Sequence, residues 1–118
     1  MCICYDAFFP ELWKLISLKG AELIICVSAS LAYWSGCFEL VLPARALENT
    51  VFVAFVNLVG KQDSMIFWGE PQVYGPWGNL IVKAPYFKER IDYAELDFGE
   101  IKAARADRPF LKSARMKF

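Results

Sequence analysis

Cys4 is the residue of this sequence whose side chain is best suited to covalent chemistry, because a thiolate attacks carbonyl carbon readily. It lies in the triplet Cys4-Tyr5-Asp6, directly after a very short apolar run. The sequence contains no His, which excludes Cys-His and Ser-His chemistry within the chain. The residues alone leave two interpretations open. Cys4 is either a small apolar residue that closes a buried strand, or a nucleophile whose helpers lie elsewhere.

A nucleophilic cysteine needs a base or a nearby cation, since a free thiol with a pKa near ~8.5 is mostly protonated at neutral pH. The nearest carboxylates in the sequence are Asp6 and Glu11, and the nearest cations are Lys14 and Lys19. A glutamate in the first turn of a helix already suits the helix dipole, and the two lysines suit a solvated helix edge. We therefore expect none of these four side chains to activate Cys4.

The composition is unusually apolar, with 57% hydrophobic residues even without glycine, against about 45–50% with glycine in ordinary soluble domains. This excess must be buried against another surface, and a second chain is the simplest partner. No apolar run approaches the ~18–20 residues of a membrane span, and the start lacks the pattern of a signal peptide. We expect neither a membrane partner nor a leader.

The charged residues predict no nucleic-acid partner. There are 13 basic and 13 acidic residues, so the formal net charge is zero. Basic residues gather near the end of the chain, but acidic residues are interleaved with them, which favours a solvated face over a phosphate site.

The cysteines predict a reducing compartment. The chain has four, Cys2, Cys4, Cys26 and Cys37, and none shows C-x-x-C spacing. This pattern favours reduced thiols in the cytoplasm over a disulfide framework or a zinc site, and we expect no metal and no cofactor.

The elements that must position Cys4 alternate between strand and helix. Residues 1–5 read as the end of a strand, a helix begins at Pro10 and ends at Gly20, and residues 23–27 form a strand that is apolar on both faces. A strand, a helix and a strand at this spacing predict a parallel βαβ unit.

Further elements follow along the chain. A helical stretch runs to about Asn49 and should kink or restart at Pro43, because an interior proline costs about 3 kcal/mol. The remaining expected elements are a strand over 51–60, two short strands around the turn at 75–78, a strand over 89–96, and a helix from Asp97 to about residue 106 that Pro109 ends.

Segments in order along the chain resemble the carbon–nitrogen hydrolase (nitrilase) superfamily. They are CYD with FPE (residues 4–6 and 9–11), GAELIICVSAS (20–30), ARALENTVFVAFVNLVG (44–60), FWGEPQVYGPWGNL (67–80) and AELDFGEIKAARADRPFL (94–111). The resemblance implies an α/β fold, namely the C-terminal half of a nitrilase-like α-β-β-α sandwich with a mixed sheet. Residues 1–118 would form one partial domain that starts at the nucleophile segment.

The family's chemistry is acyl transfer to a thiol. A glutamate takes the cysteine proton, the thiolate attacks an amide or nitrile carbon, and a lysine and a backbone N–H stabilise the oxyanion. The resemblance implies that Cys4 is the nucleophile and that Tyr5 supplies the backbone oxyanion donor. The family's glutamate and lysine precede the cysteine, whereas only three residues precede Cys4. We therefore expect the chain alone to be inactive.

The resemblance also implies substrates and partners. The Cys-Tyr-Asp and Phe-Pro-Glu segments look like the amidase and carbamoylase branches, so a small amide, carbamoyl or nitrile compound is expected. The partner would be a complementing N-terminal half or a further copy of the chain, with Phe9, Leu12 and Trp13 as candidates for an oligomer contact. The alternatives are a non-catalytic remnant that serves as an oligomerisation or binding module, and an unrelated α/β domain with a buried Cys4.

The sequence departs from the family pattern at three positions. Pro71 replaces a serine of the hairpin, Val27 replaces a proline, and Pro43 interrupts a helix that is normally continuous. Trp34, Trp68 and Trp77 are candidates for a pocket wall, although core positions are commoner for tryptophan. Glu48 and Asn49 match structural positions at a helix end.

Overall fold

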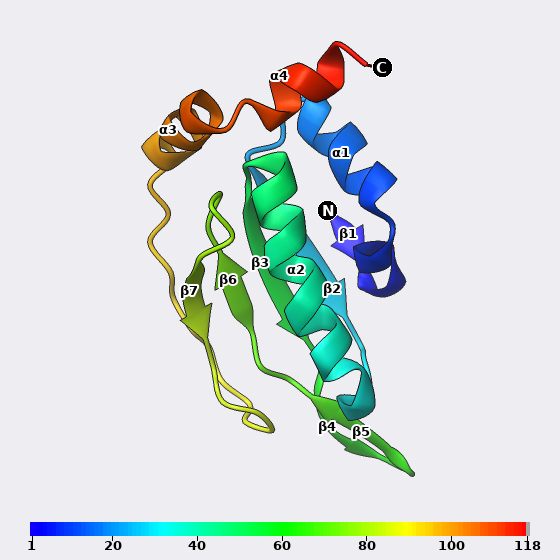
Figure 1. Cartoon of the computed structure of the whole chain (residues 1–118). Coiled ribbons are helices and arrows are strands. Elements are labelled where there is room, and N and C mark those ends of the chain that lie inside the picture. The colour runs from blue at the N-terminus through cyan, green and yellow to red at the C-terminus, as the bar shows by residue number, and fades with distance from the viewer. Residues whose placement is uncertain (118) are drawn as a thin grey trace.

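The computed structural model describes residues 1–117, and its centre is a mixed sheet with strand order β1-β2-β3-β6-β7 (Figure 1). These strands are β1 (Cys2–Ile3), β2 (Leu23–Ser28), β3 (Phe52–Asn57), β6 (Gln72–Tyr74) and β7 (Leu80–Lys83). The first three are parallel, which confirms the predicted βαβ unit, and β6 and β7 pair antiparallel. A separate hairpin consists of β4 (Val59–Gln62) and β5 (Met65–Trp68).

The helices gather on one face and at one end of this sheet. They are the short 3₁₀ turns η1 (Cys4–Phe8) and η2 (Ala32–Trp34), and the helices α1 (Pro10–Leu18), α2 (Ser35–Asn49), α3 (Gly99–Asp107) and α4 (Phe110–Arg115). Helix α2 lies across the sheet, α1 lies beside it, and α3 and α4 close one end (Figure 1). Among residues 1–117, no helix is long and apolar enough to cross a membrane.

The covered face of the sheet forms the hydrophobic core. Cys2, Cys26 and Phe55 lie side by side in the register of β1, β2 and β3, and all three are buried. Because side chains alternate between the faces of a strand, Ile24 and Val53 point to the same side. The helices complete this core with residues Trp13, Phe38, Leu42 and Ala46.

The opposite face of the sheet is aliphatic and largely open. In register, Ile3, Val27 and Val56 form one row, and a second row consists of Ile25, Ala54, Val73 and Val82. Ile3 is 58% exposed and Val56 is 51% exposed. An open sheet face of this composition is typical of a surface that packs against another structure. It accounts for the apolar excess of the sequence.

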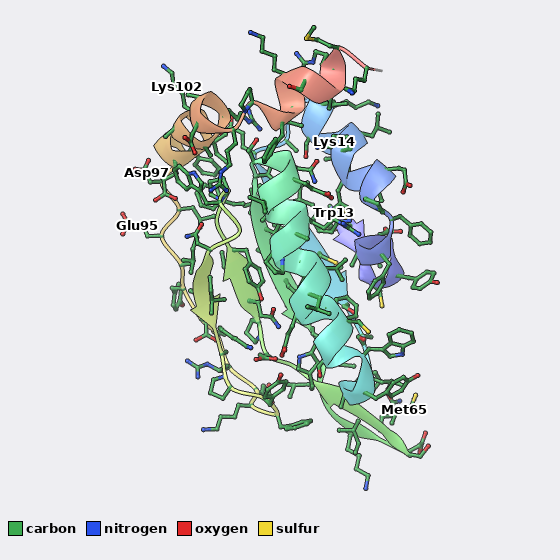
Figure 2. All side chains as sticks on the ribbon, in the orientation of Figure 1. Trp13, Lys14, Met65, Glu95, Asp97 and Lys102 are labelled. Atoms are coloured by element: carbon green, nitrogen blue, oxygen red, sulfur yellow. The ribbon has the colours of Figure 1, made fainter. Side chains whose placement is uncertain are left out.

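The strand predicted over 89–96 does not form. This segment is irregular, and Ile91 and Tyr93 are more than four-fifths exposed. Figure 2 shows Glu95 extending away from the body of the molecule. A strand needs a neighbouring edge for its N–H and C=O groups, and within residues 1–117 no strand pairs with this segment. The prediction of a strand over 89–96 was therefore wrong.

The helix predicted to kink or restart at Pro43 begins at Ser35 and continues without a new start to Asn49. Phe38, Leu42 and Ala46 hold it on the sheet because their side chains are buried in the core. This burial outweighs the hydrogen bond that Pro43 cannot donate to the carbonyl four residues earlier.

A buried carboxylate joins the far edge of the sheet to α2. Glu70 is 1% exposed and accepts a hydrogen bond of 3.1 Å from the Trp68 indole. The Lys83 ammonium lies 3.3 Å from Glu70 and 3.5 Å from Glu39 of α2, and the Tyr86 hydroxyl also donates to Glu39. Burial raises the pKa of Glu70, and the contact with Lys83 opposes this shift.

We predict that Pro43→Ala increases the free energy of unfolding by about 1–3 kcal/mol, because alanine restores the missing helical hydrogen bond. Urea unfolding followed by circular dichroism measures this change. Pro10→Ala is the matched control, since Pro10 occupies the first turn of α1, where no N–H is lost, and should bring no gain. Equal effects at the two positions would contradict the explanation.

We also predict a pH dependence that Glu70 controls. Its pKa in the folded chain is raised above the ordinary value of 4.5. The folded chain therefore binds this proton more tightly than the unfolded chain, and the resulting stability is complete below about pH 4.5 and lost as the pH rises through the raised pKa. Lys83 does not titrate in this pH range, because its pKa is raised above the ordinary value of 10.5.

The measurement compares urea unfolding of the natural chain and Glu70→Gln between about pH 4.5 and 7. The stability of the natural chain relative to the variant should decrease as the pH rises. Glu22→Gln, at an exposed carboxylate, controls for the loss of one ionisable group. A difference that stays constant with pH would disprove the role of Glu70.

Candidate active site

Cys4 lies where β1 ends and η1 begins, in an unusual backbone conformation. Its φ is +47°, in the left-handed region that residues other than glycine rarely adopt. Such a conformation costs on the order of 1–3 kcal/mol and persists only where neighbouring contacts impose it. Asp6 supplies one such contact, because its Oδ2 accepts a hydrogen bond of 2.9 Å from the Ile3 N–H on the other side of Cys4.

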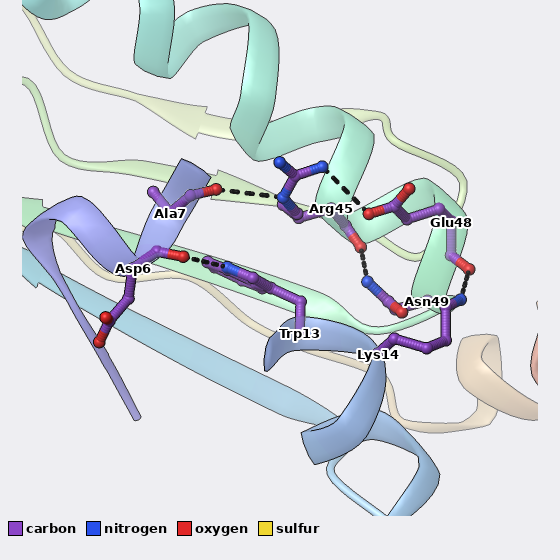
Figure 3. Close-up of polar contacts among 7 residues, drawn as sticks. All are labelled: Asp6, Ala7, Trp13, Lys14, Arg45, Glu48 and Asn49. Carbon is purple, nitrogen blue, oxygen red and sulfur yellow. Dashed lines mark hydrogen bonds and ion pairs between the residues drawn. The ribbon is translucent and has the colours of Figure 1, made fainter. Parts of the chain in front are cut away.

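Two helices fix the rest of this turn (Figure 3). The indole of Trp13 in α1 donates to the Asp6 carbonyl at 2.9 Å, and Arg45 Nε in α2 donates to the Ala7 carbonyl at 3.1 Å. Trp13 is fully buried, so the prediction that it forms an oligomer contact was wrong. The Trp13 side chain instead packs inside the chain, and its indole N–H holds the segment that carries Cys4.

The end of α2 is fastened by a second group of contacts in Figure 3. Arg45 Nη1 donates to Glu48 Oε1 at 3.1 Å, and the Asn49 amide donates to the Arg45 carbonyl at 2.8 Å. This confirms the structural role predicted for Glu48 and Asn49. Lys14 Nζ donates to the Glu48 carbonyl at 2.6 Å. Burial lowers the pKa of Lys14, and the nearby Glu48 carboxylate opposes this shift.

Cys4 lies beside the ends of two neighbouring strands. The Ser28 hydroxyl, at the end of β2, donates to the Cys4 sulfur at 3.2 Å. Asn57, at the end of β3, accepts from the Ser30 N–H at 2.8 Å and donates to the Ser30 carbonyl at 3.3 Å. These contacts shape the loop after β2 next to Cys4. The carboxyl ends of three parallel strands thus meet at this point.

A small pocket opens here. Its volume is about 170 Å³ and it is lined by Cys4, Tyr5, Phe8, Ser30, Trp34 and Phe38. Cys4 is half-buried and Tyr5 is 65% exposed. Of the three tryptophans proposed for a pocket wall, Trp34 lines this pocket, whereas Trp68 is packed between Phe38 and Phe55 in the core.

The charged residues near Cys4 in the sequence do not line the pocket. Asp6 caps the turn, Lys14 binds the end of α2, and Glu11 and Lys19 are exposed on and just after α1. Within residues 1–117, no group of three or more His, Cys, Asp or Glu side chains is arranged to hold a metal ion.

The other cysteines differ from Cys4 in their surroundings. Cys2 and Cys26 are buried against each other in register, and burial raises the pKa of Cys26 to about 12. Burial also raises the pKa of Cys2. Cys37 is exposed on α2. Only Cys4 combines partial exposure with a pocket.

Sequence reasoning did not place Phe8, Ser28, Ser30, Phe38 and Asn57 at the site. The serines and Asn57 lie in segments that matched the family pattern, so their positions at strand ends could have indicated a site. Nothing in the spacing of Phe8 and Phe38 distinguishes a pocket wall from ordinary core.

A larger cavity of about 400 Å³ lies elsewhere, between the open sheet face and residues 88–94. Its walls include Ala54, Val73 and Val82 of the aliphatic rows. Cys4 is not among its lining residues, so we do not assign it to the reaction.

Comparison with known proteins agrees with the fold. The model of the carbon–nitrogen hydrolase family matches residues 1–106. The chain is 42% identical over 107 residues to the glutamine-dependent NAD(+) synthetase of Aquifex aeolicus, covering 87% of this chain and 19% of that protein. It is 32% identical over 117 residues to the (R)-stereoselective amidase of a Pseudomonas species, covering 98% of this chain and 42% of the amidase.

Solved structures show the same fold. The crystal structure of the carbon–nitrogen hydrolase from Helicobacter pylori G27 superimposes with a TM-score of 0.87 at 28% identity, over 98% of this chain and 45% of that one. The chain therefore spans less than half the length of these relatives.

We predict that Asp6→Ala lowers the free energy of unfolding by about 1 kcal/mol, because the Ile3 N–H loses its acceptor and the left-handed turn at Cys4 loses a support. Asp6→Asn is the matched control, since an amide oxygen can still accept this bond, and it should retain at least half of the stability. Chemical denaturation measures both. If Asp6→Ala and Asp6→Asn were equally destabilised, the charge of Asp6 and not its hydrogen bond would be the support.

Proposed function

Because this chain belongs to the carbon–nitrogen hydrolase family, we propose that it carries the nucleophile of an amidase-type hydrolase and that this nucleophile is Cys4. The observation that carries the proposal is the position of Cys4. It follows directly on the first of three parallel strands, and Ser28 and Asn57 end the next two. Ligands of such sheets bind outside the carboxyl ends of the strands.

The strained backbone at Cys4 supports the same assignment. Positive φ values at residues other than glycine concentrate at functional sites, where the surroundings maintain them. Here Asp6, Trp13 and Arg45 all contribute to a turn that presents one partly exposed thiol to a pocket.

In the proposed reaction, the Cys4 thiolate attacks the carbonyl carbon of a small amide or carbamoyl compound, or the carbon of a nitrile. For an amide, the new S–C bond forms a tetrahedral intermediate, the C–N bond then breaks, and the amine leaves with a proton. Water hydrolyses the thioester, which releases the acid and restores the thiol. The backbone N–H of Tyr5, the residue after the nucleophile, would stabilise the oxyanion, as the family resemblance implies.

The base and the cation of this reaction are proposed to come from polypeptide outside these 118 residues, in the same chain or another. No charged side chain lines the pocket beside Cys4. The open aliphatic rows of the sheet offer the surface on which a complementing half, with the family's glutamate and lysine, would pack. The free thiols support a reducing compartment such as the cytoplasm.

We predict that the 118-residue chain alone releases no ammonia from primary amides but is acylated at Cys4 by p-nitrophenyl acetate. An activated ester needs no protonation of its leaving group, so the thiol can react without the base and the cation. Mass spectrometry of the peptides locates the acetyl group, and an ammonia assay measures turnover.

Cys4→Ala should remove the adduct at this position, and Cys37→Ser should leave it unchanged. Ammonia release that disappears in Cys4→Ala would disprove the need for an outside base. A chain acetylated at Cys37 but never at Cys4 would disprove the nucleophile and favour a non-catalytic binding module.

A further inference from the structure

The pocket beside Cys4 has aromatic walls. Phe8, Trp34 and Phe38 line it together with Tyr5 and Ser30. The rings of Phe8 and Phe38 meet edge to face at 4.9 Å, and Phe8 lies 6.2 Å from Trp34. Edge-to-face and tilted arrangements at these distances are favourable and leave ring faces and edges available to a further ring.

These walls rest on a rigid support. Phe38 is 2% exposed and packs against Phe55 at 5.0 Å and Trp68 at 5.5 Å, both of which are buried. The inner side of the pocket is therefore held by the core. Trp34, which is 40% exposed, forms its outer side. A pocket that is shaped before a ligand binds loses little free energy on ordering.

The size and charge of the pocket restrict what it can hold. Its volume of about 170 Å³ is close to the ~150 Å³ of a cavity that accepts one benzene ring. None of its lining residues is an acid or a base. A carboxylate placed there would lose part of its hydration without gaining a counter-charge, which is unfavourable. A phenyl or branched alkyl group would instead gain contacts with the rings.

We propose that this pocket receives the acyl side of the substrate and selects uncharged aromatic or branched alkyl acyl groups over acyl groups that carry a carboxylate. Phe8 and Trp34 are then the residues that determine specificity. This inference rests on the proposed function, because it requires Cys4 to be the residue that is acylated.

The test compares two activated esters on the natural 118-residue chain. One is p-nitrophenyl phenylacetate, and the other is the mono-p-nitrophenyl ester of succinic acid, whose acyl group carries a carboxylate. In both, the thiolate forms a thioester and p-nitrophenolate leaves. Peptide mass spectrometry gives the ratio of acylation at Cys4 to acylation at Cys37, which is exposed on α2 and serves as the internal reference.

We expect this ratio to be at least about tenfold higher for the phenylacetyl ester than for the succinyl ester, because the charged group must be desolvated. Trp34→Ala and Phe8→Ala should reduce the difference to less than about threefold, whereas Trp34→Phe should retain most of it. Tyr33→Ala is the matched control. Tyr33 adjoins Trp34 and is 74% exposed, but it does not line the pocket, so its loss should have no effect.

The outcomes separate the two proposals. Equal ratios for the two esters, or a preference for the succinyl ester, would overturn the inference about the acyl group. The assignment of Cys4 as the nucleophile would be unaffected. Acylation confined to Cys37 with both esters would overturn the proposed function itself. Cys2 and Cys26 are buried, so their protection from the reagents verifies in each variant that the chain is folded.

Discussion

The left-handed backbone of Cys4 depends on a set of hydrogen bonds made by residues on both sides of it. The Asp6 carboxylate binds the Ile3 N–H, and two helices bind the next carbonyls through Trp13 and Arg45. None of these three side chains forms a hydrogen bond with the thiol, yet together they fix where it lies. Because Arg45 also binds Glu48 and α2 rests on the sheet, the position of Cys4 is coupled to the packing of the whole covered face.

The sheet divides two tasks between its faces. Cys2, Cys26 and Phe55 on one face bury against α1 and α2, and this core supports Phe38 from below. The rows of Ile3 and Ile25 on the other face are aliphatic and open. A sheet with two exposed aliphatic faces would not be stable. A sheet with one face covered by helices and the other face open suits a layer in a larger sandwich. The superposition on less than half of a solved family member agrees with this arrangement.

Much of the fold could be predicted from local pattern. The apolar run at 23–27, Pro10 at a helix start and Gly20 after its end led to the correct parallel unit. The predicted restart at Pro43 and the predicted strand over 89–96 do not occur, because both outcomes depend on distant contacts. Helix α2 continues through Pro43 because the core holds it, and 89–96 stays irregular because it has no neighbouring strand.

The candidate site was predictable only in part, for the same reason. The family pattern identified Cys4, but it could not show that Trp13 is an internal support and not an interface residue. Phe8 and Phe38 come from a 3₁₀ turn and a helix that are adjacent only in the folded chain. Residue type and spacing can identify a reactive group, whereas the shape of the space beside it is a property of packing.

The structure suggests why the pocket beside Cys4 and the charged groups proposed to activate the thiol would lie on different layers. Within residues 1–117, the pocket beside Cys4 has aromatic walls supported by the core, and none of its lining residues carries a formal charge. A carboxylate base placed among these rings would lose hydration without gaining a counter-charge. Under the proposed function, the base and the cation reach the thiol from another side, on polypeptide that packs against the open aliphatic face. In such an arrangement, substitutions in the pocket can change which acyl groups fit, while the charged groups stay on the opposing layer. Specificity and activation of the thiol can then be altered independently.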